Sequence, residues 1–209
     1  MRSVPRRLPR QGSSRWRSPT LACRACLIGW RRFRSRRWSA GSCGFRDQRV
    51  VGGRRLGLLG ASKGGELALL AWSRFSEHLS AVVGFAASPV VWQAVPRDRR
   101  DRRQPPRSSW TVAGAPVPFV GYGRLPVSAI VSLASGALLH RPVRLLGLYE
   151  RALEREPKAV EAAMIPVERI AAPILLISGT DDQLWPSTAF GELAMKRLAR
   201  SERPYRDTH

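Results

Sequence analysis

The chain has 209 residues, which is enough for one domain with a real hydrophobic core and leaves no room for a second complete domain. Its hydrophobic fraction of 44% is ordinary for a globular protein, whereas its formal net charge of +21 is strongly basic. No secretory signal is found, and no apolar stretch reaches the roughly 20 residues that span a bilayer, so we expect neither secretion nor a membrane span.

The basic excess lies at the start of the chain. Residues 1–50 contain fourteen arginines, no lysine and a single acid, whereas charges of both signs are mixed from Gly114 onward. We interpret residues 1–50 as a disordered basic segment, because the stretch is poor in acids and has little apolar periodicity. Two other interpretations stay open: a phosphate-binding arm for nucleic acid or an anionic membrane, and an organelle transit peptide. The one folded domain is expected over residues 51–209.

Three cysteines, Cys23, Cys26 and Cys43, include one C-x-x-C spacing. A structural zinc site needs four ligands, and neither a second pair nor a nearby histidine completes it, so we expect no metal. An odd number of cysteines without a signal peptide is typical of a reducing compartment. We therefore expect a cytoplasmic protein, and we expect no cofactor.

The first ordered elements are predicted from about residue 54. The apolar run RLGLLG (residues 55–60) lacks polar alternation, which predicts a parallel strand covered on both faces. Residues 63–75 have a helical pattern, with Glu66 near the helix N-terminus, where the macrodipole favours an acid. Residues 79–89 predict a second strand, so strand, helix and strand form a right-handed parallel crossover.

The remaining elements follow in chain order. Residues 96–109 predict a charged, proline-rich and solvated loop, and the apolar stretch VSAIVSLASGALL (residues 127–139) predicts a buried helix or a lid. Two amphipathic helices, a third strand and a last helix capped by Ser187 are predicted over residues 141–154, 157–165, 172–182 and 187–199. Together the elements predict an α/β fold with a mostly parallel sheet flanked by helices.

The sequence GASKG (residues 60–64) fits G-x-S-x-G, the nucleophile elbow, in which a strand turns sharply into a helix. The turn requires small neighbours and lifts the hydroxyl of Ser62 out of the carboxyl edge of the sheet. It also directs the backbone amide of Lys63 at the carbonyl oxygen of a bound acyl group. We predict Ser62 as a nucleophile and the Lys63 amide as an oxyanion donor, with a plain tight turn as the alternative. The Lys63 side chain is expected to be solvated, because adjacent side chains diverge.

A serine nucleophile needs a base and an orienting carboxylate, which come in the chain order Ser, Asp or Glu, His on a sheet of this kind. The third predicted strand is followed by GTDD, where Asp182, three residues beyond Gly179, is the predicted acid. Asp181 is predicted to stabilise the loop. The alternative is that both aspartates only form turn hydrogen bonds.

Four separated segments carry a family resemblance: GLLGASKGGELALLAWSRF, AVVGFAASPVVWQ, PPRSSWTVAGAPVPFV and AAMIPVERIAAPILLISGTDDQLWPS. In this register residues 54–209 resemble the C-terminal catalytic domain shared by acyl-CoA thioesterases and bile acid-CoA:amino acid N-acyltransferases. The resemblance implies an α/β-hydrolase fold, partial in this chain, with Ser62 as nucleophile and Asp182 as acid. A serine at this position resembles the hydrolytic members, since the conjugating enzyme carries cysteine there. Hydrolysis of acyl-CoA to a fatty acid and CoA is therefore implied.

The chain departs from the family pattern in two places. The catalytic histidine of the family lies beyond the residues that match RPYRDTH, so we expect the base to be absent and the activity impaired. His209 would lie where the next strand begins, and His78 and His140 are expected to be structural or exposed. The N-terminal β-sandwich domain of the family, its first sheet strands and the second oxyanion donor have no counterpart in residues 1–50.

Other functions remain open from the sequence. An acyl-CoA:amino acid N-acyltransferase, a carboxylesterase or a peptidase shares the same elbow, and fold does not determine substrate. From another class, residues 1–50 would suit a basic nucleic-acid-binding protein, although we do not expect nucleic acid as a partner. The sequence does not indicate an oligomeric state.

Overall fold

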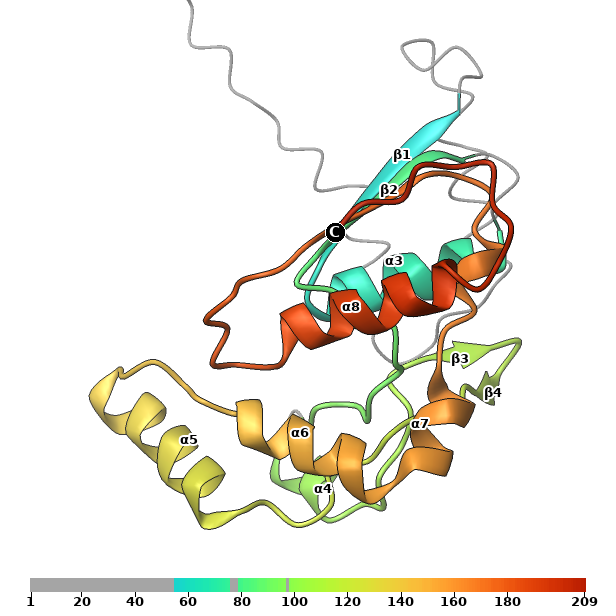
Figure 1. Ribbon diagram of the computed structural model, residues 1–209. Coiled ribbons are helices and arrows are strands. Elements are labelled where there is room, and N and C mark those ends of the chain that lie inside the picture. Colours follow the sequence, from blue (N-terminus) through green and yellow to red (C-terminus); the bar gives the residue numbers. More distant parts are fainter. Residues whose placement is uncertain (1–54, 76–78, 97) are drawn as a thin grey trace, which may run out of the picture.

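The computed structural model describes residues 55–75, 79–96 and 98–209. The predictions for residues 1–50, including the three cysteines, and for His78 lie outside the described residues. Three strands form the main sheet, β1 (Leu56–Ala61), β2 (Leu79–Phe85) and β5 (Ile174–Ile177), all parallel and in the order β1-β2-β5. The α/β fold with a parallel sheet and flanking helices, expected from the sequence, is confirmed (Figure 1).

Two helices lie on the same side of this sheet, α3 (Lys63–Trp72) and α8 (Ser187–Leu198) (Figure 1). The side chains of Val82, Ile174 and Leu176 point to this side and are buried. Ser187 begins α8 without capping it, because its hydroxyl contacts the backbone of Gly179 instead. The expectation that Ser187 caps the last helix is therefore wrong.

The other side of the sheet is exposed. Its side chains alternate with the buried ones along each strand, as the pleat requires, and the large ones are Leu59 (70% exposed), Phe85, Leu175 and Ile177. The expectation that residues 55–60 form a strand covered on both faces is wrong, because the described elements cover only one face. A purely apolar run predicts a strand, but it does not show whether a second layer of the protein packs on that strand.

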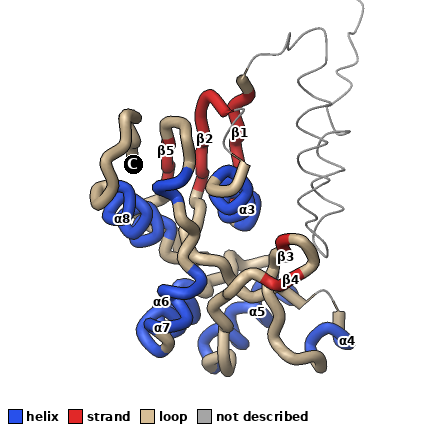
Figure 2. The backbone as a smooth tube through the Cα atoms, turned by 90° about the vertical axis from the view of Figure 1, so that its right-hand side faces the viewer, coloured by secondary structure: helices blue, strands red, loops and turns tan. Residues whose placement is uncertain are grey.

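The segments between β2 and β5 form a cap, which lies below the sheet and its two helices in both views (Figures 1 and 2). The cap consists of α4 (Arg99–Arg102), the antiparallel pair β3 (Thr111–Val112) and β4 (Ala115–Pro116), α5 (Val127–Leu139), α6 (Leu146–Arg155), α7 (Pro157–Ala163) and the 3-10 helix η3 (Val167–Arg169).

Two expectations for the cap need correction. Residues 96–109 are not wholly a solvated loop, because α4 forms there with Asp98 capping it, and Asp101 is buried and paired with Arg107 at 2.8 Å. Helix α5 is not buried, since Ala129 is its only buried residue. No helix of the described residues is long and apolar enough to cross a membrane.

A chain of aromatic rings joins the cap to the sheet layer. Trp92, which follows β2, contacts Tyr149 of α6 edge to face, with 4.8 Å between ring centroids. Tyr149 contacts Trp185 at 5.7 Å, and Trp185 contacts Phe190 of α8 at 5.2 Å. Such pairs stabilise a core beyond the apolar area that they bury. The chain of rings therefore fixes the cap against the loop that follows β5.

The last residues of the chain lie beside β5. Thr208 forms a parallel bridge with Leu175, and the two segments exchange hydrogen bonds of 2.8 and 2.9 Å. The guanidinium of Arg203 holds this segment in place by donating to Asp207 and to the carbonyls of Glu168, Ile170 and Ala172. His209 therefore lies where a further parallel strand would begin beside β5, as expected from the sequence.

Candidate active site

The turn from β1 into α3 has a strained backbone at Ser62. This residue has φ 51° and ψ −124°, a conformation that is costly for any residue with a side chain. Its amide donates to the carbonyl of Phe85 at 2.8 Å, and its carbonyl accepts the first helical hydrogen bond, from Glu66, at 3.1 Å. The strain is therefore held by β2 on one side and by α3 on the other. The strand–turn–helix geometry predicted for GASKG is present.

The glycines around Ser62 differ in how strictly they are needed. A Cβ at Gly60 would lie 2.3 Å from the carbonyl oxygen of Gly64, and one at Gly65 would lie 2.6 Å from the Cβ of Ala87. A Cβ at Gly64 would meet nothing within 4 Å. The close approach of strand and helix thus depends on Gly60 and Gly65, and the last glycine of the G-x-S-x-G pattern is not one that the packing requires.

The side chain of Ser62 is partly exposed, and its hydroxyl forms no hydrogen bond with a described residue. Lys63 is the first residue of α3, so its amide has no acceptor within the helix. A serine hydroxyl next to a helix N-terminal amide supplies two of the groups that attack on an acyl group requires, the nucleophile and an oxyanion donor. The roles of Ser62 and of the Lys63 amide stay predictions.

Asp182 lies in the loop after β5. One carboxylate oxygen, Oδ1, accepts hydrogen bonds from the amides of Leu184 at 3.0 Å and Trp185 at 3.3 Å. The other oxygen has no hydrogen bond to a described residue. The Asp181 side chain is exposed and accepts from the Gln183 side chain at 2.6 Å. Turn hydrogen bonds therefore orient the Asp182 carboxylate and leave one oxygen for a further partner.

Ser62 and Asp182 lie at the same edge of the sheet. Ala61, Phe85 and Ile177 are aligned across the three parallel strands, and the two candidate residues follow the first and the last of these. Strands β1 and β5 are two spacings apart, which is about 10 Å. Ser62 and Asp182 thus follow strands that end at the same edge of the sheet, and no hydrogen bond between the two residues is present.

No imidazole of the described residues contacts Ser62. The segment that ends in His209 lies on the far side of β5 from β1, so about 14 Å separates it from β1 at the usual strand spacing. The His209 Nε2 atom lies 2.8 Å from the Ser178 hydroxyl. His140 ends α5 in a left-handed conformation, φ 53°, and is exposed. Neither of these two histidines contacts Ser62.

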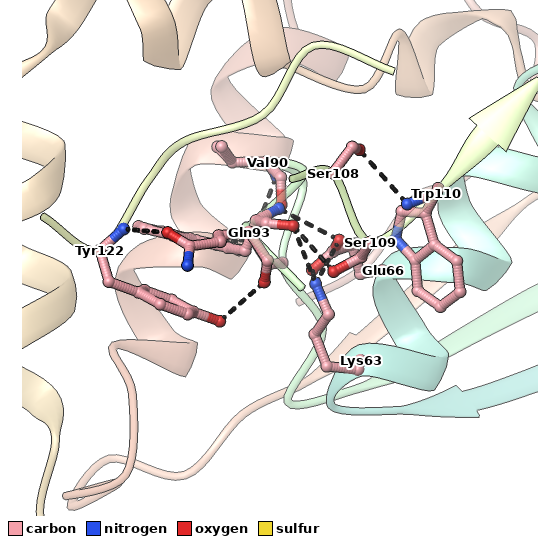
Figure 3. Close-up of polar contacts among 10 residues, drawn as sticks. Lys63, Glu66, Val90, Gln93, Ser108, Ser109, Trp110 and Tyr122 are labelled. Carbon is pink, nitrogen blue, oxygen red and sulfur yellow. Dashed lines mark hydrogen bonds and ion pairs between the residues drawn. The ribbon is translucent and has the colours of Figure 1, made fainter. Parts of the chain in front are cut away.

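Directly behind the elbow lies a buried ion pair (Figure 3). The Lys63 ammonium contacts both Glu66 oxygens at 2.7 Å, with the glutamate side chain 0% exposed and the lysine side chain 13% exposed. The Trp110 indole donates to Glu66 Oε1 at 2.7 Å, and the Trp92 amide donates to the same atom at 3.2 Å. The expectation of a solvated Lys63 is wrong, because a carboxylate one helical turn away draws its side chain inward.

The electrostatics of the pair follow from its burial. Burial raises the pKa of the Glu66 carboxyl, and the Lys63 ammonium and the two donated hydrogen bonds oppose that rise. Burial likewise lowers the pKa of Lys63, and Glu66 opposes that fall. Each charge thus depends on the other, since neither has enough water to stabilise it. The Lys63 ammonium is engaged by Glu66 and is not available as a base for Ser62.

Sequence reasoning missed the acceptor role of Glu66. The one local signal was the spacing of lysine and glutamate by three residues on a helix, which allows an ion pair. Nothing local indicates Trp110, which is 44 positions from Glu66 in the chain. Within the described ranges no cluster of three or more histidine, cysteine, aspartate or glutamate side chains is placed to hold a metal.

A parallel sheet with helices, a strained serine between strand and helix, and an aspartate at the same edge define a domain of the α/β-hydrolase type. The family model described as BAAT / Acyl-CoA thioester hydrolase C terminal matches residues 44–208, more than half of the chain. The chain belongs to this family of acyl-CoA thioester hydrolase C-terminal domains.

Two solved structures resemble the chain more distantly. A bacterial membrane phospholipase A, described as a virulence factor, is 20% identical with a TM-score of 0.37, over 85% of this chain and 55% of that one. Rv0554 from Mycobacterium tuberculosis is 16% identical with a TM-score of 0.40, over 84% of this chain and 64% of that one. The chain thus spans less than two thirds of either protein. The comparison with curated proteins finds no match.

Proposed function

We propose that this domain is a serine hydrolase of the acyl-CoA thioesterase type, with Ser62 as nucleophile. The observation that carries the proposal is the strained backbone of Ser62, whose hydroxyl has no hydrogen bond to a described residue and lies at the sheet edge that β5 and the Asp182 loop also reach. The family of the chain supports an acyl-CoA thioester as substrate. The Asp182 carboxylate at this edge supports the proposal further, because a carboxylate orients the general base in a catalytic triad.

The chemistry proceeds through an acyl-enzyme. The Ser62 oxygen attacks the thioester carbonyl, and the Lys63 amide donates to the oxyanion that forms. The carbon–sulfur bond breaks, CoA leaves as its thiol after taking up the serine proton, and an ester of Ser62 remains. Water then attacks this ester and releases the fatty acid, returning the proton to Ser62. Each proton transfer needs a base, and Asp182 orients that base without itself reaching the serine.

We further propose that the 209-residue protein turns over slowly, because neither described histidine contacts Ser62. Free imidazole is then expected to act as a base that the described residues do not supply. Thiol release from a long-chain acyl-CoA is measured with and without imidazole, for the natural chain and for Ser62→Ala. General-base catalysis usually contributes about 10²- to 10⁴-fold, so we expect a partial rescue of about tenfold over Ser62→Ala.

Each other outcome has a definite meaning. Equal thiol release by both proteins at every imidazole concentration would remove Ser62 as nucleophile. Rapid turnover without imidazole that Ser62→Ala abolishes would support Ser62 as the nucleophile and would contradict the proposal of slow turnover. N-acylglycine formed when glycine is added would support the N-acyltransferase alternative instead of hydrolysis. Asp182→Asn is expected to reduce the rescue less than Ser62→Ala, since a diffusing imidazole needs its orienting group less.

A further inference from the structure

Helix α5 packs with its polarity reversed relative to an ordinary surface helix. Its large apolar side chains point outward, with Val127 76% exposed, Val131 60% and Leu138 78%. Together with Ile130 they recur at intervals of three, four and seven residues, so they form one stripe along the helix. We call Val127, Ile130, Val131 and Leu138 the apolar stripe.

The residues of α5 opposite the apolar stripe include the small residues Ala129, Ser132 and Gly136. Ala129 is the buried one, and the Ser132 hydroxyl accepts a hydrogen bond from the Arg144 amide at 2.6 Å. A Cβ at Gly136 would lie 2.6 Å from a methyl carbon of Val143, so only glycine allows this approach. These contacts place this side of the helix against the segment of residues 141–144 that follows it. The outward direction of the apolar stripe is thus a consequence of specific packing.

The surroundings of α5 are basic. The helix carries no charged residue, Arg124 precedes it, and Arg141 and Arg144 follow it, all three exposed. The sequence contains no aspartate or glutamate from residue 102 to residue 149. An exposed apolar stripe with cations at both ends matches a surface that is apolar inside and negatively charged at its boundary.

We propose that α5 is a membrane-surface helix that binds anionic phospholipid bilayers through the apolar stripe. With 13 residues and a rise of 1.5 Å per residue it is about 20 Å long, shorter than the roughly 30 Å hydrocarbon core, so it lies in the plane of the interface. Arg124 and Arg141 contact lipid phosphates at its two ends. This inference goes beyond the proposed hydrolase function and does not depend on it.

A second copy of the chain fits this surface less well than a bilayer does. Two stripes packed face to face would bring the arginines at the ends of both helices close together. The cap segment between residues 102 and 149 offers no carboxylate to pair with them. Like charges brought together at an interface disfavour association, whereas an anionic headgroup layer supplies the missing negative charge.

The test measures vesicle binding of the full chain. Arginines in residues 1–50 also attract anionic lipid, so matched variants are compared at equal net charge and at high salt, where exposed charges are screened. Val131→Gln with Leu138→Gln alters the stripe. Leu59→Gln with Leu175→Gln alters exposed leucines of the sheet and is the control. Vesicles contain either phosphatidylglycerol with phosphatidylcholine, or phosphatidylcholine alone.

We expect the stripe variant to lose about tenfold or more of its partitioning onto the anionic vesicles, with the control pair unchanged. Hydrogen exchange of residues 127–139 slows when anionic vesicles are added, and exchange of residues 56–61 does not. Thermal unfolding confirms that both variants fold. Partitioning onto pure phosphatidylcholine is weaker for every protein.

Three results would each overturn the proposal. Equal loss by the stripe pair and the control pair would indicate non-specific hydrophobic adsorption. Unchanged exchange over residues 127–139 with vesicles bound would place the contact elsewhere, residues 1–50 included. Slowed exchange over the same residues without lipid, together with a dimer that the stripe variant abolishes, would make a second copy the occupant.

Discussion

At the scale of single residues, Ser62 shows how local sequence holds a strained backbone in place. A positive φ at a serine is unfavourable by itself, and the structure offsets it with hydrogen bonds on both sides of the turn. Two of the three nearby glycines allow strand and helix to approach closely, and the third, Gly64, lies in open space. In the G-x-S-x-G pattern the packing therefore requires glycine at Gly60 and allows a side chain at Gly64.

Substitution of alanine for two glycines of the pattern separates these cases. We expect Gly60→Ala to lower the free energy of unfolding by about 1–3 kcal/mol, because its Cβ would overlap the backbone of Gly64. Gly64→Ala leaves it unchanged or raises it by about 0.5 kcal/mol, since alanine favours a helix more than glycine does. Urea unfolding of both variants measures the difference, and equal losses would contradict the packing argument.

At the scale of elements, Glu66 joins α3 to the segments that follow β2. Its carboxylate accepts from the Trp92 amide and the Trp110 indole while it pairs with Lys63. The helix that begins at the elbow is thus attached to the cap through one buried oxygen. Replacing both members of a buried ion pair by neutral groups is often tolerated, whereas removing one leaves the other charge unpaired.

A pair of variants tests this attachment. Glu66→Gln keeps an acceptor for both tryptophan donors and leaves the Lys63 ammonium unpaired, so we expect a loss of about 3 kcal/mol of stability. Lys63→Met combined with Glu66→Gln removes both charges and is expected to lose less than the single substitution. Chemical unfolding of the three proteins gives the comparison. A double variant that is less stable than Glu66→Gln would contradict the prediction, because it would show that the Lys63 side chain stabilises the fold even without the Glu66 charge.

At the scale of the whole molecule, the sheet has one covered face and one open face in the described structure. Consecutive residues of β5 lie on opposite sides, Leu175 being 39% exposed and Leu176 4% exposed. The core that holds the cap, α3 and α8 together therefore lies on one side of the strands. The open face contributes little to the burial of apolar surface that stabilises the domain.

Adjacent leucines of β5 make this asymmetry measurable. We expect Leu175→Gln to change the free energy of unfolding by no more than about 0.5 kcal/mol, as surface substitutions do. Leu176→Gln places an amide in the core and is expected to cost about 3 kcal/mol or more. Calorimetry on both variants checks the prediction. Similar losses at the two positions would mean that a further layer of the protein covers the open face.

Some features of the candidate site follow from local sequence, and others depend on residues that are distant in the chain. The geometry at Ser62 follows from an apolar run, a glycine and a helical pattern in direct succession, and all three are local signals. The prediction of a solvated Lys63 was wrong because its side chain pairs with Glu66, and the other partners of Glu66, Trp92 and Trp110, lie far along the chain. The roles of Ser62 and Asp182 in catalysis stay predictions that the imidazole experiment tests.

Sequence patterns alone predicted the parallel strands β1, β2 and β5, their flanking helices, the elbow and the family, because periodicity and turn residues act over a few neighbouring positions. The three-dimensional packing was needed to show which apolar faces are covered, that His209 contacts Ser178, and that large side chains of α5 are exposed. Burial and charge pairing depend on residues distant in the chain. A pattern of apolar residues predicts an apolar face on a strand or helix, but it does not indicate what packs against that face.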